Sequence, residues 1–248
     1  MRLAIIGTAL LLALARPAMA QNAPGAPGVQ AHTLAASKVA ELGRAPLYVC
    51  ALSVTIPAAA ASHIAGTANG IFYQLSGSTE IGIGAASKTV TAGEALFIPA
   101  GNQEVSLKAV GDGPSRALQF LLVADSSPGS PIATEPAHVD EMFRSPGPVP
   151  DLKAGAYQMT LTRRTFPPGT PPSPPRHHSG AALLYVLSGT GTHTVDSKST
   201  DEGPGSLIYE PSSLVYRWGN RGGEPWTYLA FTLSPEGMPP TVAASSPK

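Results

Sequence analysis

The sequence predicts an all-β protein made of two similar modules in tandem, from a long internal repeat and from short strand-like runs inside each copy. The stretch at residues 93–101 returns at 205–213, and the Leu-Ser-Gly triplet at 75–77 returns at 187–189. Because residue 93 corresponds to 205 and residue 77 to 189, the offset is 112 residues for both landmarks. A period of this length is too long for a solenoid repeat and fits a compact domain. We therefore expect a duplicated domain.

Runs of β-branched and aromatic residues, separated by Gly, Pro, Asn and Asp, predict the strands. In the first module they cover 71–75, 79–83, 88–90, 95–98 and 117–123, and in the second 182–187, 192–195, 206–209 and 226–233. This spacing is typical of antiparallel strands in a sandwich or barrel. Gly tolerates positive φ and Pro restricts φ at a strand end, so the repeated Leu-Ser-Gly and Gly-x5-Pro segments predict the tight corners.

The first twenty residues have the pattern of a cleavable secretory signal peptide. Arg2 precedes an apolar run at 3–15, and the Ala-Met-Ala triplet at 18–20 forms a small-residue cleavage site before Gln21. The run is too short to span a bilayer, and no later stretch reaches the roughly 20 apolar residues of a membrane helix. We expect a periplasmic or secreted protein without a membrane anchor.

Composition divides the rest of the chain into two domains, a connector and two tails. Both ends and the stretch between the modules are rich in Pro, Ala, Gly or Ser and lack a sustained apolar period. The predicted boundaries are an N-terminal tail at 21–44, a first domain at 45–125, a connector at 126–152, a second domain at 153–234 and a C-terminal tail at 235–248.

Net charge and cysteine content exclude several classes of function. The chain has 16 Lys plus Arg and 16 Asp plus Glu, without a dense run of either sign. Nucleic acids and anionic membranes are recognised by clustered Lys and Arg, so neither is an expected partner. Cys50 is the single cysteine and cannot form an internal disulfide. Its apolar surroundings at 47–54 predict a buried small hydrophobic residue rather than a reactive thiol.

The turn and strand framework resembles that of cupins, and the chain as a whole resembles a bicupin, which has two double-stranded β-helix (jelly-roll) barrels. The second cupin motif, Gly-x5-Pro-x-Gly-x2-His-x3-Asn, is matched at 93–104 up to its His, where this chain has Glu104. In the second module its first Gly, Pro and Asn are present, and Tyr216 stands at the His position. The first motif, His-x-His-x3-4-Glu-x6-Gly, is recognisable at 176–189. The resemblance covers residues 50–124 and 155–233.

Metal-dependent cupins, as the resemblance implies, hold Mn, Fe, Ni, Cu or Zn with two His and a Glu of the first motif and the His of the second. Such an ion needs several deprotonated N or O donors that converge from rigid strands. In the second module these positions fall on Arg176, His178, Ala182 and Tyr216. His178 is the good ligand among them, and His177 is the second metal-ligand candidate.

The first module is predicted to be structural. Its corresponding positions fall on Ile64, Gly66, Gly70 and Glu104, and His63 is one residue out of phase, which points it away from the cavity. Bicupin ureidoglycine aminohydrolases are similar in pairing a metal-free first module with a site in the second. Their ligand set shares only the position of His178 with this chain.

Three hypotheses remain for the second module. A metal-dependent bicupin enzyme, of oxidoreductase, decarboxylase, isomerase or aminohydrolase type, would use His177 and His178 together with Tyr216, and His193 is a further candidate. A metal-free isomerase or lyase would use His178 and Tyr216 as a catalytic acid-base pair, in outline similar to the sugar-nucleotide epimerases of the cupin superfamily. A binding module would hold a small organic molecule in its cavity. The expected ligand-binding residues are Arg176, His177, His193 and Trp218.

We favour an exported bicupin that binds an organic acid or a sugar-like molecule in the second barrel, and leave its catalytic activity open. Arg176 is available to clamp a carboxylate or phosphate. Arg163 and Arg164 are expected at a solvated edge. Because cupins commonly pair through barrel edges, the resemblance also implies a homodimer as a candidate assembly.

Overall fold

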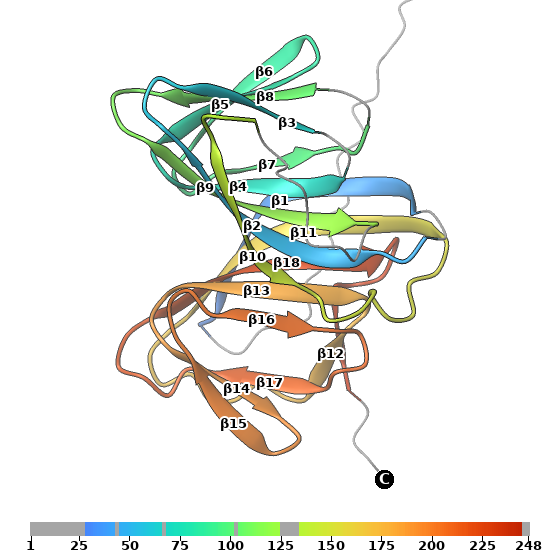
Figure 1. Ribbon diagram of the computed structural model, residues 1–248. Helices are drawn as coiled ribbons and strands as arrows, with labels where there is room; N and C mark the ends of the chain where they lie inside the picture. Colours follow the sequence, from blue (N-terminus) through green and yellow to red (C-terminus); the bar gives the residue numbers. More distant parts are fainter. Residues whose placement is uncertain (1–27, 43–44, 66–67, 102–103, 125–133, 245–248) are drawn as a thin grey trace, which may run out of the picture.

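The computed structural model of the chain describes residues 28–42, 45–65, 68–101, 104–124 and 134–244. These residues form strands, turns and extended connections, and no helix occurs among them. Two barrels are stacked so that one sheet of the first barrel faces one sheet of the second (Figure 1). The prediction of an all-β chain with two barrels is confirmed.

The first barrel consists of a five-stranded and a four-stranded antiparallel sheet. The larger sheet has the order β10 (His138–Arg144), β2 (Tyr48–Ile56), β9 (Ser115–Val123), β4 (Asn69–Ser76) and β7 (Ala95–Ile98). The smaller sheet has the order β3 (Ala61–Ala65), β8 (Glu104–Val110), β5 (Ser78–Ile83) and β6 (Ala86–Thr91). Apolar side chains fill the space between them, among them Ile64, Phe72 and Leu107.

The second barrel has two five-stranded sheets. The inner sheet, which lies against the first barrel, has the order β1 (Gln30–Leu42), β11 (Gly155–Phe166), β18 (Trp226–Pro235), β13 (Ala181–Ser188) and β16 (Leu207–Glu210). The outer sheet has the order β15 (Lys198–Glu202), β14 (Gly191–Val195), β17 (Tyr216–Gly219), β12 (Arg176–His178) and β19 (Thr241–Ala243).

The repeated Leu-Ser-Gly corners have the same backbone in both barrels. Gly77 and Gly189 follow β4 and β13 with φ of 70° and 71°. A Cβ at Gly77 would lie 2.8 Å from the carbonyl oxygen of Pro114, and one at Gly189 would lie 2.2 Å from that of Pro225. Both corners therefore need glycine for its positive φ and for the close approach of a second segment.

The N-terminal segment expected as a tail at 21–44 contains a strand of the second barrel. Strand β1 pairs with β11, with Gln30 opposite Thr165 and Val39 opposite Tyr157. Its alanine-rich sequence shows little apolar period, but Val39 and Leu42 are buried between the barrels. Backbone pairing with a strand more than one hundred residues away stabilises β1. The predicted signal peptide at 1–20 lies outside the described residues.

Two other segments expected to be irregular also pair with the sheets. Strand β10, inside the predicted connector at 126–152, joins the edge of the first barrel beside β2. Strand β19, inside the predicted C-terminal tail at 235–248, pairs with β12 of the second barrel. Short edge strands depend on a partner that local composition does not reveal.

A shared apolar core joins the two barrels. It contains buried side chains from the two sheets that face each other, those of β9 and β18. The rings of Phe120 and Phe231 are stacked there with centroids 5.6 Å apart. Cys50 is fully buried in the first barrel, and its burial raises the pKa of the thiol to about 12. The thiol therefore stays protonated at neutral pH, as the expectation of an unreactive cysteine requires.

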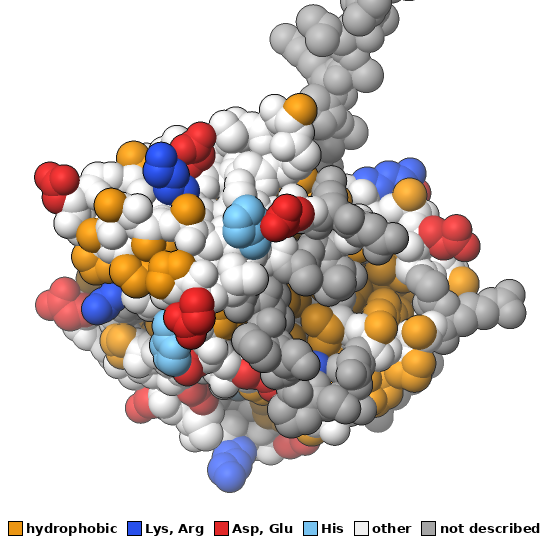
Figure 2. Space-filling view, turned by 45° about the horizontal axis from the view of Figure 1, so that its top comes forward, with side chains coloured by type: hydrophobic (Ala, Val, Ile, Leu, Met, Phe, Trp, Pro, Cys, Tyr) orange, Lys and Arg blue, Asp and Glu red, His pale blue; other side chains and the backbone are white. Residues whose placement is uncertain are grey.

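No helix long and apolar enough to cross a bilayer occurs in the described ranges. On the face shown in Figure 2, acidic and basic side chains are scattered among polar and apolar ones.

Candidate functional site

A small cavity lies inside the second barrel, between its two sheets. Strands β11, β18, β13 and β16 supply one wall, and β12, β17 and β19 supply the opposite wall. The cavity volume is about 40 Å³, on a scale where one water needs roughly 10–15 Å³. The cavity therefore suits a compact ligand.

Strand register explains which side chains reach this cavity. Arg164 on β11 is paired with Tyr228 on β18, and Ala182 on β13 is paired with Glu210 on β16. Directly paired residues project from the same face of a sheet. Arg164, Tyr228 and Glu210 line the cavity, and Ala182 is fully buried beside it.

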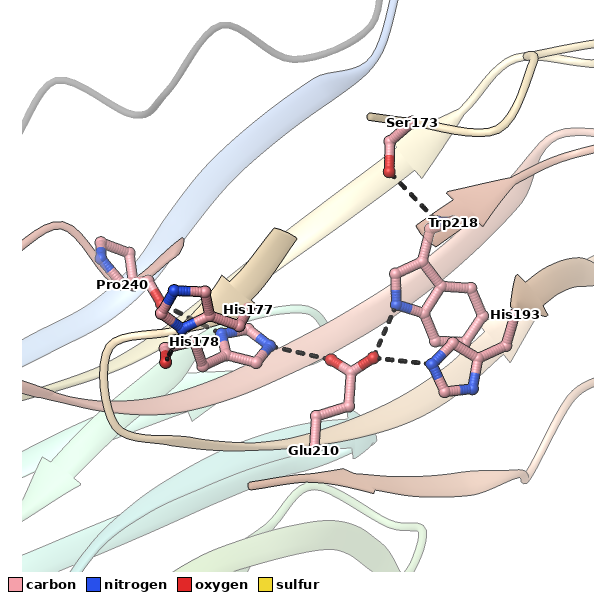
Figure 3. Close-up of polar contacts among 7 residues, drawn as sticks. All are labelled: Ser173, His177, His178, His193, Glu210, Trp218 and Pro240. Atoms are coloured by element: carbon pink, nitrogen blue, oxygen red, sulfur yellow. Dashed lines mark hydrogen bonds and ion pairs between the residues drawn. The ribbon is translucent and has the colours of Figure 1, made fainter. Parts of the chain in front are cut away.

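Glu210 is the centre of a buried polar cluster (Figure 3). Its Oε2 accepts a hydrogen bond from Nε2 of His178 at 2.8 Å, and its Oε1 accepts one from Nε1 of Trp218 at 2.9 Å. His193 Nε2 also lies 3.0 Å from Oε1, outside hydrogen-bond geometry. Burial alone would raise the pKa of Glu210, but the contacts with both histidines outweigh it and lower that pKa. Glu210 is therefore an ionised carboxylate with its charge compensated.

The ring of His178 is held between two hydrogen-bond acceptors. Nε2 faces the carboxylate of Glu210, and Nδ1 lies 3.0 Å from the carbonyl oxygen of Pro240. A neutral imidazole has one N–H and cannot donate to both, whereas an imidazolium can. Both ring nitrogens of His178 are therefore engaged with acceptors of the protein itself.

Tyr216 lies in the cavity next to His178, with ring centroids 5.0 Å apart in a stacked arrangement. Burial, followed by the charge of Glu210, raises the pKa of Tyr216 well above its ordinary value, although a hydrogen bond with Thr241 lowers it. The phenol is therefore protonated at neutral pH. The structure brings the two predicted catalytic residues together, with Tyr216 held as a phenol and both nitrogens of His178 facing acceptors of the protein.

Two guanidinium groups, those of Arg164 and Arg176, line the same cavity. Neither forms an ion pair with an acidic residue in the described part of the chain. The phenol of Tyr228 lies near both: burial raises its pKa to about 12, and both guanidinium charges oppose that rise. Because two guanidinium groups and one carboxylate line it, the cavity has a net positive charge.

The remaining predicted ligand residues lie around the cavity in different ways. Trp218 lines it and orients Glu210. His193 is buried behind Trp218, with stacked rings 4.1 Å apart, and does not line the cavity. His177 lies on the opposite face of β12 and lines a separate outer groove with residues 149–157. Its Nδ1 is 3.0 Å from the carbonyl oxygen of His178.

Arg163 and Arg164 were expected at a solvated edge, but the structure places neither of them there. Strand alternation sends them to opposite faces of β11. Arg164 faces the cavity, whereas Arg163 hydrogen-bonds the phenol of Tyr73 in the first barrel. One arginine therefore belongs to the site and its neighbour to the contact between the barrels.

The corresponding positions of the first barrel do not form a polar site. Ile64 is buried in the apolar interior, as its phase predicts. Glu104, which stands at the ligand position, points outward and pairs with His63, with Nδ1 and Oε1 2.8 Å apart and the side chains 73% and 48% exposed. Gly66 lies outside the described residues.

The residues present do not fit the four-ligand metal set that the resemblance implies. Arg176 brings a positive charge, Ala182 has no donor, the phenol of Tyr216 is held protonated, and both nitrogens of His178 already face acceptors. Across the described ranges no three His, Cys, Asp or Glu side chains are arranged to hold a metal ion.

The lowered pKa of Glu210 predicts acid sensitivity. Since the folded-state pKa lies below the ordinary value of 4.5, the contribution of Glu210 to stability is present above that value and is lost as pH falls through the folded-state pKa. We expect the difference in free energy of unfolding between the wild type and Glu210→Gln to shrink on going from about pH 7 to about pH 3. Urea unfolding at several pH values measures it, and a pH-independent difference would contradict the assignment.

The fold defines a protein of two β-barrels. Residues 162–232, in the second barrel, match the family model of the cupin domain, Cupin_2. The predicted resemblance to cupins is confirmed. No curated protein sequence matches the chain.

Solved structures show the same fold at low sequence identity. AerE from Microcystis aeruginosa is 15% identical, covers 73% of this chain and 86% of its own, and has a TM-score of 0.52. Oxalate decarboxylase from Bacillus subtilis at pH 4.6 is 14% identical, with 90% of this chain and 79% of that chain covered and a TM-score of 0.55. A single-residue mutant of that enzyme is 14% identical, with 90% of this chain and 80% of that chain covered and a TM-score of 0.56. Identities this low support the fold alone.

Among the cavity residues that sequence reasoning missed are the two charged groups of Arg164 and Glu210 and the phenol of Tyr228. A signal was available for Glu210. In a strand at 207–210, alternate side chains share a face, so Glu210 lies on the same face as Ile208, and these two residues are the buried ones. The glutamate of the first motif is absent at Ala182, and a carboxylate stands directly opposite on the neighbouring strand. The other two become visible only once the register of β11 and β18 is known.

Proposed function

We propose that this chain is an exported binding protein whose second barrel holds a small organic anion, with a carboxylate as the recognised group. The observation that carries the proposal is the pair of arginines, Arg164 and Arg176, which line one small cavity without an acidic partner among the described residues. A carboxylate accepts paired hydrogen bonds from a guanidinium group and supplies the missing negative charge.

The polar groups of the cavity favour an acceptor-rich ligand over a sugar. Arg164, Arg176 and the protonated phenol of Tyr228 are donors, whereas the main acceptor, Glu210, is already occupied by His178 and Trp218. A sugar hydroxyl needs both a donor and an acceptor, while a carboxylate needs donors only. The donor-rich lining therefore supports an organic acid.

The protonation of the cavity supports binding without turnover. General acid-base catalysis needs a group that can accept a proton from the substrate. Both nitrogens of His178 face acceptors of the protein, and Tyr216 is held as a neutral phenol. Export rests on the leader at 1–20, which lies outside the described residues, and the homodimer stays a prediction from the resemblance.

Isothermal titration with acetate, oxalate, succinate and benzoate, and with glucose as a neutral comparison, tests this function. We expect at least one carboxylate to bind and glucose not to bind. Loss of a hydrogen bond to a charged group costs about 1.5–3 kcal/mol, so Arg164→Ala and Arg176→Ala should each weaken binding by roughly 10–100-fold.

Arg217→Ala is the matched control, because Arg217 lies on β17 of the same barrel with its side chain exposed. It should leave affinity unchanged. Tyr216→Phe should also retain most affinity, since the ring remains and only one hydroxyl is lost. Absence of binding by every carboxylate, or equal losses in the Arg217 and Arg176 variants, would refute the proposal.

Elemental analysis of the untagged protein addresses the metal-dependent alternative. One of the similar oxalate decarboxylase structures concerns the Mn(II) centres of that enzyme, whereas the donor set of this cavity differs. We expect no stoichiometric Mn, Fe, Ni, Cu or Zn after growth in supplemented medium. A stoichiometric metal that His178→Ala removes would overturn the metal-free proposal.

A further inference from the structure

We infer that Val29, from the segment that precedes the N-terminal strand, sets the size of the acid that the second-barrel cavity accepts. This specificity-determining role rests on the proposed binding function. Val29 lies far outside the matched cupin segment at 162–232, in a part of the chain whose composition predicts a tail. It nevertheless lines the cavity.

The register of β1 places Val29 on the cavity side of the sheet. Ala31 is paired with Arg164 and Gln30 with Thr165, so Val29, the next residue outward, comes opposite Phe166. Side chains two residues apart on a strand project from the same face. Val29 therefore lies on the same face as Arg164 and Phe166, and it packs against the aromatic cluster of the second barrel.

The segment that carries Val29 runs close to the end of β11. Gly28 has φ of 87°, and a Cβ there would lie 3.3 Å from Cγ of Pro167, directly after β11. On the other side of Val29, Gln30 is paired with Thr165. Both neighbours of Val29 therefore lie next to the end of β11.

The cavity has chemically different parts, and Val29 belongs to the apolar one. Arg164, Arg176 and Tyr228 provide donors for a carboxylate, whereas Val29, Phe166 and Leu184 provide apolar surface for the rest of the ligand. Because the cavity is small, at about 40 Å³, removal of the two terminal carbons of valine should enlarge the space for the apolar part of the ligand. The ligand class is thus a carboxylic acid with a short apolar part.

Changing the size of residue 29 in both directions tests the inference. Val29→Ala should improve the affinity for benzoate relative to acetate, and Val29→Phe should weaken binding of the carboxylate that the wild type binds best. One methylene in an apolar pocket changes discrimination by roughly 10–200-fold, so each shift should reach at least about tenfold. Isothermal titration with acetate, butyrate and benzoate provides the affinities.

Val215→Ala and Val215→Phe are the matched controls, because Val215 is 42% exposed on the same barrel and does not line the cavity. Neither should change the benzoate-to-acetate ratio. If the Val29 variants leave the ratio unchanged while Arg176→Ala still weakens binding, the size-limiting role fails and the binding function stands. If neither the wild type nor Val29→Ala binds any carboxylate, both fail.

Discussion

Replacing Glu210 with alanine should lower the free energy of unfolding by about 3–5 kcal/mol, which is the usual cost of removing one partner of a buried ion pair. The substitution leaves Nε2 of His178 and Nε1 of Trp218 without the carboxylate that both contact. Glu210 is fully buried, so its replacement by alanine leaves these polar groups in the interior of the barrel. Urea unfolding followed by fluorescence measures the change.

The first barrel offers a matched control in the exposed pair of His63 and Glu104. Its atoms are 2.8 Å apart, as in the buried pair, but the glutamate side chain is 73% exposed. Exposed ion pairs contribute about 0–1 kcal/mol, so Glu104→Ala should be nearly neutral. Equal losses for the Glu104 and Glu210 variants would show that burial is not what makes the Glu210 pair important.

Replacing Phe120 with alanine should destabilise both barrels together. Phe120 is fully buried and stacks on Phe231 across the shared core. Truncation of a buried phenylalanine costs about 3–5 kcal/mol. The core contains side chains from both barrels. We therefore expect the wild type and the variant each to unfold in one transition, with the transition of the variant at lower denaturant concentration.

Phe120→Leu removes the ring but leaves a smaller cavity than Phe120→Ala. Because the cost of truncating a core side chain grows with the cavity left behind, this variant should lose less stability than Phe120→Ala. Scanning calorimetry of the three proteins provides the comparison. Two resolved transitions in the wild type would mean that the barrels unfold separately and that the interface does not couple them.

Much of the strand framework could be predicted because its signals are local. Gly77 and Gly189 mark corners that need positive φ, and both adopt it. Alternation also predicts that Ile64 faces the interior of the first barrel and that His63 does not, which the structure shows. The tails and the connector were misassigned, because β1, β10 and β19 are stabilised by pairing with distant strands rather than by their own composition.

The candidate site was predicted only in part. Counting along the first motif correctly places Arg176 and His178 at the cavity, and counting along the second places Tyr216 there. The carboxylate that holds His178 was not found, because Glu210 belongs to a different motif position and meets His178 only across the barrel. Whether these residues bind a ligand stays a prediction.

The sequence by itself determines the duplication, the all-β class and the glycine corners, since each depends on the conformational preferences of residues close together in the chain. Only the tertiary structure decides the chemistry of the cavity. Arg164, Glu210 and Val29 come from three distant segments, and strand pairing brings all three to the cavity of the second barrel. A shift of one residue in any of these registers would turn the side chain to the other face. The charge and size of the site therefore depend on strand pairing, which no local pattern encodes.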